Sequence, residues 1–198
     1  MKTPTLTEAI RLMIRAIPDS LLGCRDRALL LVGFAGAFRR SELVSLDVED
    51  LAFEREGVIV TFRRSKTDAA GQGRKIGIPL GSGKTCPIRA LEKWMELAGI
   101  EEGPLFRPVT RHKHVEDCRL SDKAVALIVN RWAQAVGLDP ADYAGHSLRF
   151  GLATSAARNG ASERAIMNQT GHRSVQMVRR YIREETIFQE NAFSMTGL

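Results

Sequence analysis

The chain has 198 residues, enough to bury one hydrophobic core, and its 44% hydrophobic and 26% charged residues are typical of a soluble globular protein. The net charge of +6 favours a polyanionic partner, with nucleic acid first, although charge alone is weak support. The uncharged run from residue 28 to 38 is too short to span a bilayer, and the first residues lack the apolar core of a signal peptide. We therefore expect a cytoplasmic protein without a membrane segment.

The first part of the chain is predicted to be helical. Apolar residues recur at helical spacing from residue 6 to 17, until Pro18 ends the pattern. Residues 25–37 predict a second helix that is apolar nearly all round and hence buried. Arg39 is expected at its C-terminal end, where a cation meets the negative end of the helix dipole. A short third helix is predicted from Ser41 to Leu46, with Ser41 as its cap.

The next segment is predicted to form a small sheet. Residues 58–62 are rich in β-branched side chains, and residues 74–79 alternate as a half-buried strand does. The loop 68–73 between them contains two glycines, which is typical of a hairpin. A short strand at residues 51–53, turning through 54–57, would complete three antiparallel strands.

The remainder of the chain is predicted to be helical again. Pro87 suits the first turn of a helix that ends near residue 98, and residues 103–119 read as a loop. Further helices are predicted through residues 121–136, 147–159 and 162–170, followed by a last one that Ser174 caps and that carries Tyr181. The expected fold class is mainly α with a small three-stranded antiparallel sheet (α+β).

The cysteine and histidine pattern does not indicate a metal centre. The three cysteines are far apart and form no C-x-x-C pair, which fits a reducing compartment better than a disulfide framework or a zinc site. His112 and His114 lie close together but have no partner cluster in the sequence. We therefore expect no metal and no cofactor.

Residues suited to phosphodiester transfer gather near the C-terminal end, with one arginine far upstream: His146, Arg149, Gly171, His172, Tyr181 and Arg39. Two guanidiniums can bind one phosphate and stabilise the charge of its transition state. A phenol can attack phosphorus to form a covalent ester, and an imidazole can move the proton. An isolated His-x-x-Arg pair, or His172 without Tyr181, would more often be structural, so these residues carry weight as a set.

The order Arg … Lys … His-x-x-Arg … Gly-His … Tyr resembles the catalytic domain of the tyrosine recombinases (phage integrase family). The resemblance runs from about Cys24 to Tyr181. It implies a site-specific DNA recombinase or integrase that cleaves and rejoins strands through a covalent 3′-phosphotyrosyl intermediate. It also implies that double-stranded DNA is the partner and that neither metal nor ATP is needed.

The resemblance assigns the phosphate-binding residues by position. Arg39 and Arg149 would bind the scissile phosphate from two sides, and His146 would assist proton transfer. His172 would donate a hydrogen bond to a non-bridging phosphate oxygen. Glu42 would brace the site without carrying a proton. Arg40 competes with Arg39, but the position after the bulky residue and three before the glutamate selects Arg39.

The remaining reaction roles fall on the hairpin and on the last helix. Tyr181 would be the nucleophile, and Lys66 would protonate the departing 5′ oxygen. Lys75, on the third strand, is the second choice for that lysine. Arg64 and Arg74 are expected to contact DNA near the cleavage point.

The resemblance also suggests how the chain is organised. Residues 1–183 would form a single catalytic domain, and the tail or helix 184–198 could dock on a neighbouring protomer or equally fold back on its own domain. The family's N-terminal DNA-clasping domain is expected to be absent, because only about 20 residues precede the match. We expect a homotetramer on two DNA segments, with a monomer possible without DNA, and weak, salt-sensitive DNA binding by this chain.

Two other functions remain open at this level. A type IB topoisomerase-like enzyme would use the same chemistry to relax supercoils. A non-cleaving DNA-binding regulator would use the same fold for recognition alone.

Overall fold

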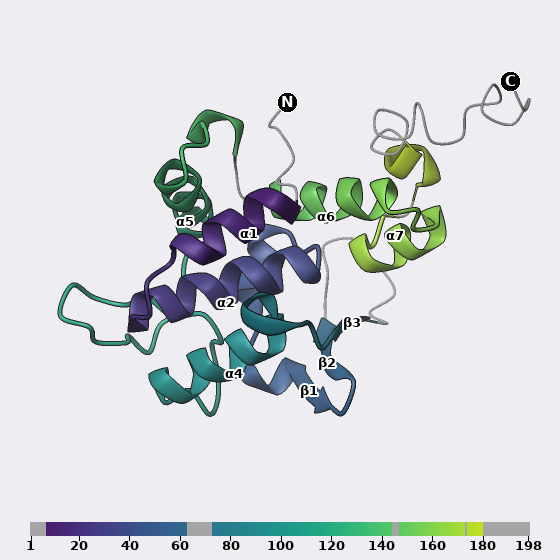
Figure 1. The fold of residues 1–198 in the computed structure, drawn as a ribbon. Coiled ribbons are helices and arrows are strands. Elements are labelled where there is room, and N and C mark those ends of the chain that lie inside the picture. Colours follow the sequence, from purple (N-terminus) through teal and green to yellow (C-terminus); the bar gives the residue numbers. More distant parts are fainter. Residues whose placement is uncertain (1–6, 63–72, 144–146, 173, 180–198) are drawn as a thin grey trace, which may run out of the picture.

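The computed structural model describes residues 7–62, 73–143, 147–172 and 174–179, and in them the chain forms seven α-helices around a core that includes a three-stranded sheet (Figure 1). The helices are α1 (Thr7–Ala16), α2 (Leu21–Ala35), α3 (Arg40–Ser45), α4 (Pro87–Ala98), α5 (Asp122–Ala135), α6 (Ser147–Arg158) and α7 (Glu163–Thr170). The strands are β1 (Leu51–Glu54), β2 (Gly57–Phe62) and β3 (Arg74–Pro79), and residues 175–179 are again helical. The predicted fold class is confirmed. No helix of the described ranges is long and apolar enough to cross a membrane.

Helix α2 is the centre of the core. It is buried nearly all round, as its sequence predicts, and it packs against α1, α4, α5 and α6. It begins at Leu21, four residues earlier than predicted, because the Ser20 hydroxyl accepts a hydrogen bond from the Gly23 N–H at 3.1 Å and caps the helix. From α4, the buried Trp94 indole donates to the Leu105 carbonyl at 2.9 Å and ties the long loop to this core.

The turn between α2 and α3 folds back sharply on itself. Ala37 has a φ of +50°, a left-handed conformation that is unusual for a residue with a side chain. The Phe38 N–H then donates to the Gly33 carbonyl at 3.1 Å. The Phe38 ring covers Gly36 so closely that a Cβ there would lie 2.2 Å from it. Phe38 also meets Phe62 of β2 edge to face, with ring centroids 5.2 Å apart.

This turn corrects the prediction made for Arg39. The second helix ends at Ala35 rather than residue 37, so Arg39 lies beyond it and occupies the cap position of α3. Ser41, predicted to be the cap, lies inside α3. The helix dipole therefore does not hold Arg39 as expected, because the N-terminus of a helix is its positive end.

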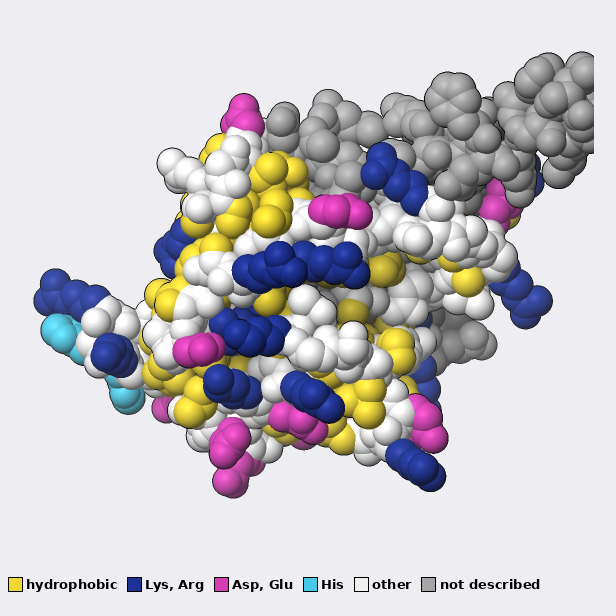
Figure 2. All heavy atoms as spheres, in the orientation of Figure 1, with side chains coloured by type: hydrophobic (Ala, Val, Ile, Leu, Met, Phe, Trp, Pro, Cys, Tyr) yellow, Lys and Arg dark blue, Asp and Glu magenta, His cyan; other side chains and the backbone are white. Residues whose placement is uncertain are grey.

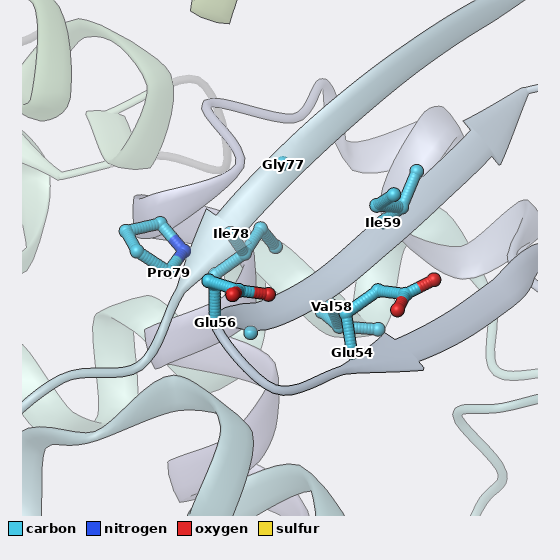
Figure 3. Close-up of a pocket in the computed structure, with 8 residues that line it drawn as sticks. Glu54, Glu56, Val58, Ile59, Gly77, Ile78 and Pro79 are labelled. Carbon is cyan, nitrogen blue, oxygen red and sulfur yellow. The ribbon is translucent and has the colours of Figure 1, made fainter.

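The sheet has the strand order β1-β2-β3 and is antiparallel throughout. In the register, Val60 pairs with Leu51 and Ile76, and Phe62 pairs with Arg74. The inner face is buried, whereas the opposite face is largely exposed. A shallow hollow on that exposed face lies between β2 and β3, with Ile59 and Pro79 at its sides and the carboxylates of Glu54 and Glu56 beside it (Figure 3).

The predicted helix starts after the sheet are confirmed. Pro87 opens α4, the Ser121 hydroxyl caps α5, and the Ser162 hydroxyl caps α7. Helix α7 packs against both α6 and β3, so the C-terminal part of the described chain closes against the sheet. Of the hairpin loop predicted at residues 68–73, residues 68–72 lie outside the described residues.

A buried charge cluster fastens α5 to α2. Asp26 is fully buried, and one of its oxygens accepts two hydrogen bonds from the Arg25 guanidinium, at 2.6 and 2.9 Å. Its other oxygen accepts from the Trp132 indole at 2.9 Å and lies 3.7 Å from Arg131. Both oxygens of the Asp26 carboxylate thus have partners, and the loss of any one partner would weaken the whole cluster.

Removal of this carboxylate should destabilise the fold strongly. Asp26→Ala leaves the Arg25 charge buried without its partner, and a lone buried charge of this kind costs about 3–5 kcal/mol. Equilibrium urea unfolding measures the loss. The control, Asp19→Ala, removes an exposed carboxylate that pairs with Arg27 and should cost less than about 1 kcal/mol. Equal losses for the two variants would contradict this account of α2–α5 packing.

Candidate active site

The structure describes part of the predicted site. Arg39, Glu42, Arg74, Arg149 and His172 lie within the described residues. The other predicted residues are outside them, and their roles stay predictions: Arg64, Lys66, His146 and Tyr181.

Arg149 joins α6 to the turn between α2 and α3. It is the third residue of α6 and is only 3% exposed. Its Nη1 donates to the Ala37 carbonyl at 3.0 Å, across 112 residues of sequence. Because Ala37 is two residues before Arg39, this bond brings the two predicted phosphate-binding arginines to the same place.

Arg39 is held by Glu42 of its own helix. The Arg39 N–H donates to Glu42 Oε2 at 2.8 Å, and the guanidinium Nη1 donates to Glu42 Oε1. The Arg39 side chain remains 35% exposed, whereas that of Glu42 is 12% exposed. Glu42 thus holds Arg39 in place, and Arg39 keeps part of its surface open to solvent.

Arg74 lies at the start of β3, between Glu42 and the end of α7. Its Nη1 donates to the Thr170 carbonyl at 3.0 Å, and its Nη2 is 3.8 Å from Glu42 Oε2. Its guanidinium also lies over the Phe62 ring, 5.4 Å from the centroid. Gly171 ends α7 with a φ of +66°, and a Cβ at this position would lie 1.6 Å from Arg74 Nη1. The left-handed backbone favours glycine here, and any larger residue would also displace the Arg74 guanidinium.

His172 follows this turn and points its Nδ1 at the end of α7. The Thr170 hydroxyl donates to the Ile166 carbonyl at 2.6 Å, so its lone pair is available to accept from His172 Nδ1 at 2.8 Å. This arrangement makes Nε2 the acceptor nitrogen of the neutral imidazole. Burial, with the positive charges of Arg149, Arg39 and Arg74, lowers the pKa of His172 from 6.5 to about 4.

Two residues that sequence reasoning missed also shape this region. The Gln169 side chain donates to the Ala35 carbonyl at 2.7 Å and ties α7 to the end of α2. Thr170 orients the imidazole, as described above. Neither carries a sequence signal, because a polar residue near a helix end is common and its partner here is distant in the chain.

Arg39, Arg149 and His172 line what we call the anion site. Three guanidiniums, counting Arg74, act on one imidazole there, and Glu42 pairs with Arg39 and Arg74. The excess positive charge suits an anion such as a phosphate.

Other surfaces differ in charge from the anion site. The hollow on the sheet has two carboxylates beside it (Figure 3). Figure 2 shows Lys and Arg side chains gathered over α1, α2 and α4, with acidic side chains among them. Between α2 and α4, Asp19 pairs with Arg27 at 2.8 Å and lies 3.8 Å from Lys93. Within the described residues, no three His, Cys, Asp or Glu side chains group as metal ligands.

The buried, neutral His172 should make stability depend on pH. The unfolded chain takes up a proton on this imidazole below about pH 6.5, whereas the folded protein does so only near pH 4. The contribution is therefore complete above pH 6.5 and is lost as the pH falls towards 4, by at most about 1.4 kcal/mol per pH unit. Urea unfolding between pH 4.5 and 7.5 should show that His172→Gln removes this part of the slope. His112→Gln, in the exposed loop, should retain it, and an equal effect of both variants would argue against a depressed pKa at His172.

Comparisons with known proteins give the geometry a context. The family model described as "Phage integrase family" matches residues 5–186. An integrase/recombinase XerD homologue from Selenomonas ruminantium is 47% identical over 195 residues, which is 98% of this chain and 57% of that protein. Tyrosine recombinase XerD from Xanthomonas axonopodis pv. citri (strain 306) is 31% identical over 190 residues, or 89% of this chain and 57% of that protein. The chain thus spans little more than half the length of these curated relatives.

Solved structures share the fold at low sequence identity. The post-cleavage complex of the XerH site-specific recombinase with a palindromic difH substrate has a TM-score of 0.74 at 18% identity, covering 100% of this chain and 54% of that one. XerA recombinase has a TM-score of 0.70 at 20% identity, covering 96% of this chain and 64% of that one. A lambda integrase (75–356) dimer bound to a COC′ core site has a TM-score of 0.64 at 20% identity, covering 91% and 59%. With its family model matched over nearly the whole sequence, the chain belongs to the phage integrase family.

Proposed function

We propose that this chain is the catalytic part of a site-specific DNA recombinase or integrase that cleaves and rejoins strands through a 3′-phosphotyrosyl intermediate. The observation that supports it most is the meeting of Arg39, Arg149 and His172 at one positively charged site, from segments more than 100 residues apart. Membership of the family and its relatives named as recombinases support the same proposal.

The scissile phosphodiester would bind at the anion site. Arg39, which is partly exposed, would meet the phosphate first, and the buried Arg149 would bind it from the side of α6. A phosphoryl transition state gathers charge on its non-bridging oxygens, and fixed guanidiniums stabilise that charge without rearranging. Since they are already held by Glu42 and the Ala37 carbonyl, little ordering is needed when DNA arrives.

His172 would complete the contact with a non-bridging oxygen. Its Nε2 must carry a proton to donate, and three neighbouring guanidiniums disfavour that proton while the site is empty of DNA. A bound phosphate adds negative charge and raises the pKa of the imidazole. Protonation of His172 would therefore accompany phosphate binding.

The covalent step would fall on Tyr181, nine residues after His172. Its phenolic oxygen would attack phosphorus as the bond to the 5′ oxygen breaks, with Lys66 giving a proton to that oxygen and His146 assisting proton transfer. A 5′ hydroxyl from another strand would then attack the phosphotyrosine and release the phenol. Each step exchanges one phosphoester for another, so the sequence of reactions requires no ATP. The arginines would supply the charge stabilisation that metal ions supply elsewhere.

Double-stranded DNA is the proposed partner, and the family's assembly is a homotetramer on two DNA segments. The similar structures of XerH and lambda integrase are complexes with DNA. Residues 1–183 would act as one catalytic domain, with the tail 184–198 docking on a neighbouring protomer. Phosphate contacts made by this chain alone would be few, so its affinity should fall steeply with salt.

A suicide-substrate experiment tests the covalent step. Nicked duplexes that tile the DNA flanking the gene are incubated with the protein in the presence of a chelator and run on a denaturing gel. We expect a protein–DNA adduct that Tyr181→Phe abolishes and that Tyr143→Phe, which changes the one other tyrosine, retains. Absence of an adduct with every duplex, despite binding, would instead favour a non-cleaving regulator. Relaxation of plasmids without any recognition site would favour a topoisomerase.

The two arginines of the anion site should each be needed for that adduct. Removal of one charge-stabilising donor lowers the rate of such a step by about 10²–10³. Arg39→Ala and Arg149→Ala should therefore slow single-turnover adduct formation by this factor. Arg89→Ala, on the exposed face of α4, serves as the control and should react like the unchanged protein. Rates within threefold of the control for both variants would rule out the anion site as the place of reaction.

A further inference from the structure

We propose that Arg74 is a positioning residue which bridges the two halves of the anion site and takes over the Glu42 carboxylate when Arg39 turns to a phosphate. This inference rests on the proposed function, because it needs Arg39 to bind the scissile phosphate. It differs from the expectation that Arg74 contacts DNA.

The position of Arg74 supports the bridge. One nitrogen of its guanidinium donates to the Thr170 carbonyl, two residues before His172, and the other faces Glu42, which orients Arg39. The same group lies over the Phe62 ring, next to Phe38 of the α2–α3 turn. Arg74 thus contacts both the segment that carries Arg39 and the one that carries His172.

The contacts of Arg74 are incomplete in one respect. Its Nη2 is buried and, among the described residues, has no hydrogen bond, although Glu42 Oε2 is 3.8 Å away. A buried donor without an acceptor costs free energy. A movement of under about 1 Å would bring this pair to the usual hydrogen-bond distance near 2.9 Å.

A phosphate at Arg39 would provide the reason for that movement. Glu42 now accepts from the Arg39 backbone and from its Nη1. A phosphate competes for Nη1, and the largely buried Glu42 carboxylate then requires another cation. Arg74 Nη2 is already beside it. The exchange releases Arg39 for the phosphate and satisfies the nitrogen of Arg74 in the same step.

A direct contact between DNA and Arg74 fits the geometry less well. Nη2 is shielded from solvent, and Nη1 is engaged by Thr170 and closed in by Gly171. A phosphate oxygen would have to displace these neighbours to reach the Arg74 guanidinium. The geometry favours action through Glu42 and the turn before His172.

The test separates DNA binding from cleavage. Arg74→Ala and Arg74→Lys are compared with Arg55→Ala, which removes an exposed arginine from the β1–β2 turn. We expect both Arg74 variants to form the covalent adduct 10- to 100-fold more slowly, with DNA affinity within threefold and an unchanged salt dependence. Lysine should not rescue, because one ammonium cannot span Thr170 and Glu42 as the planar fork does. Arg55→Ala should leave the adduct rate unchanged.

A double-mutant cycle identifies the partner. Glu42→Gln and Arg74→Ala together should slow the adduct by much less than the product of their single effects, because each breaks the same link. Multiplicative effects would overturn the bridge. The bridge would also be overturned if Arg74→Ala lost DNA affinity as much as it lost rate and its affinity depended on salt with a slope lower by about one. These changes are the signature of a lost phosphate contact. Thermal melting checks that the variants are folded. If Arg74→Ala does not fold, Arg74→Lys, which keeps the positive charge, takes its place in the cycle.

A measurement without DNA keeps this inference apart from the proposed function. Inorganic phosphate is titrated into the protein, and NMR follows the arginine Nε–H and glutamate carboxyl resonances. We expect Arg39, Glu42 and Arg74 to shift together, and the Glu42 shift to be lost in Arg74→Lys. Shifts confined to Arg39 would overturn the exchange. If the unchanged protein forms no adduct with any duplex, the proposed function fails, and the phosphate titration still decides the role of Arg74.

Discussion

The site depends on the hydrogen bond from Arg149 to the Ala37 carbonyl. The bond joins α6, near the C-terminal end of the described chain, to the α2–α3 turn. It thereby holds Arg149 against the segment that carries Arg39. The left-handed conformation of Ala37 and the Phe38 ring over Gly36 give the turn its shape. The polar site is thus built on an apolar turn, and its geometry is set by core packing as much as by charge.

The arrangement of charge explains how several cations can lie together. Arg39, Arg74 and Arg149 would repel one another in a site of low polarity, but a carboxylate, two carbonyls and an aromatic ring each take part of that charge. His172 adapts by remaining neutral. The excess positive potential that remains is available to an arriving anion.

The sequence was sufficient for most elements of the fold, whereas the roles given to the arginines stay predictions. Helices with a capping serine or an opening proline were predicted closely, because Ser121, Ser162 and Pro87 act through local chemistry. The predicted end of α2 was wrong, since hydrophobic periodicity cannot show that Ala37 adopts a left-handed conformation. The bridge by Arg74 and the orientation of His172 by Thr170 were also not predictable. Both depend on partners that only the packing of α7 against β3 and α6 brings near.

Gly171 illustrates how little freedom such a site leaves to evolution. The position has no room for a single carbon atom, because a guanidinium from another element fills the space that a side chain would take. A residue with a side chain at this position would need a left-handed backbone and a shift of the flexible Arg74 guanidinium. A larger residue at position 171 would therefore move Arg74 away from its present contacts with Thr170 and Glu42.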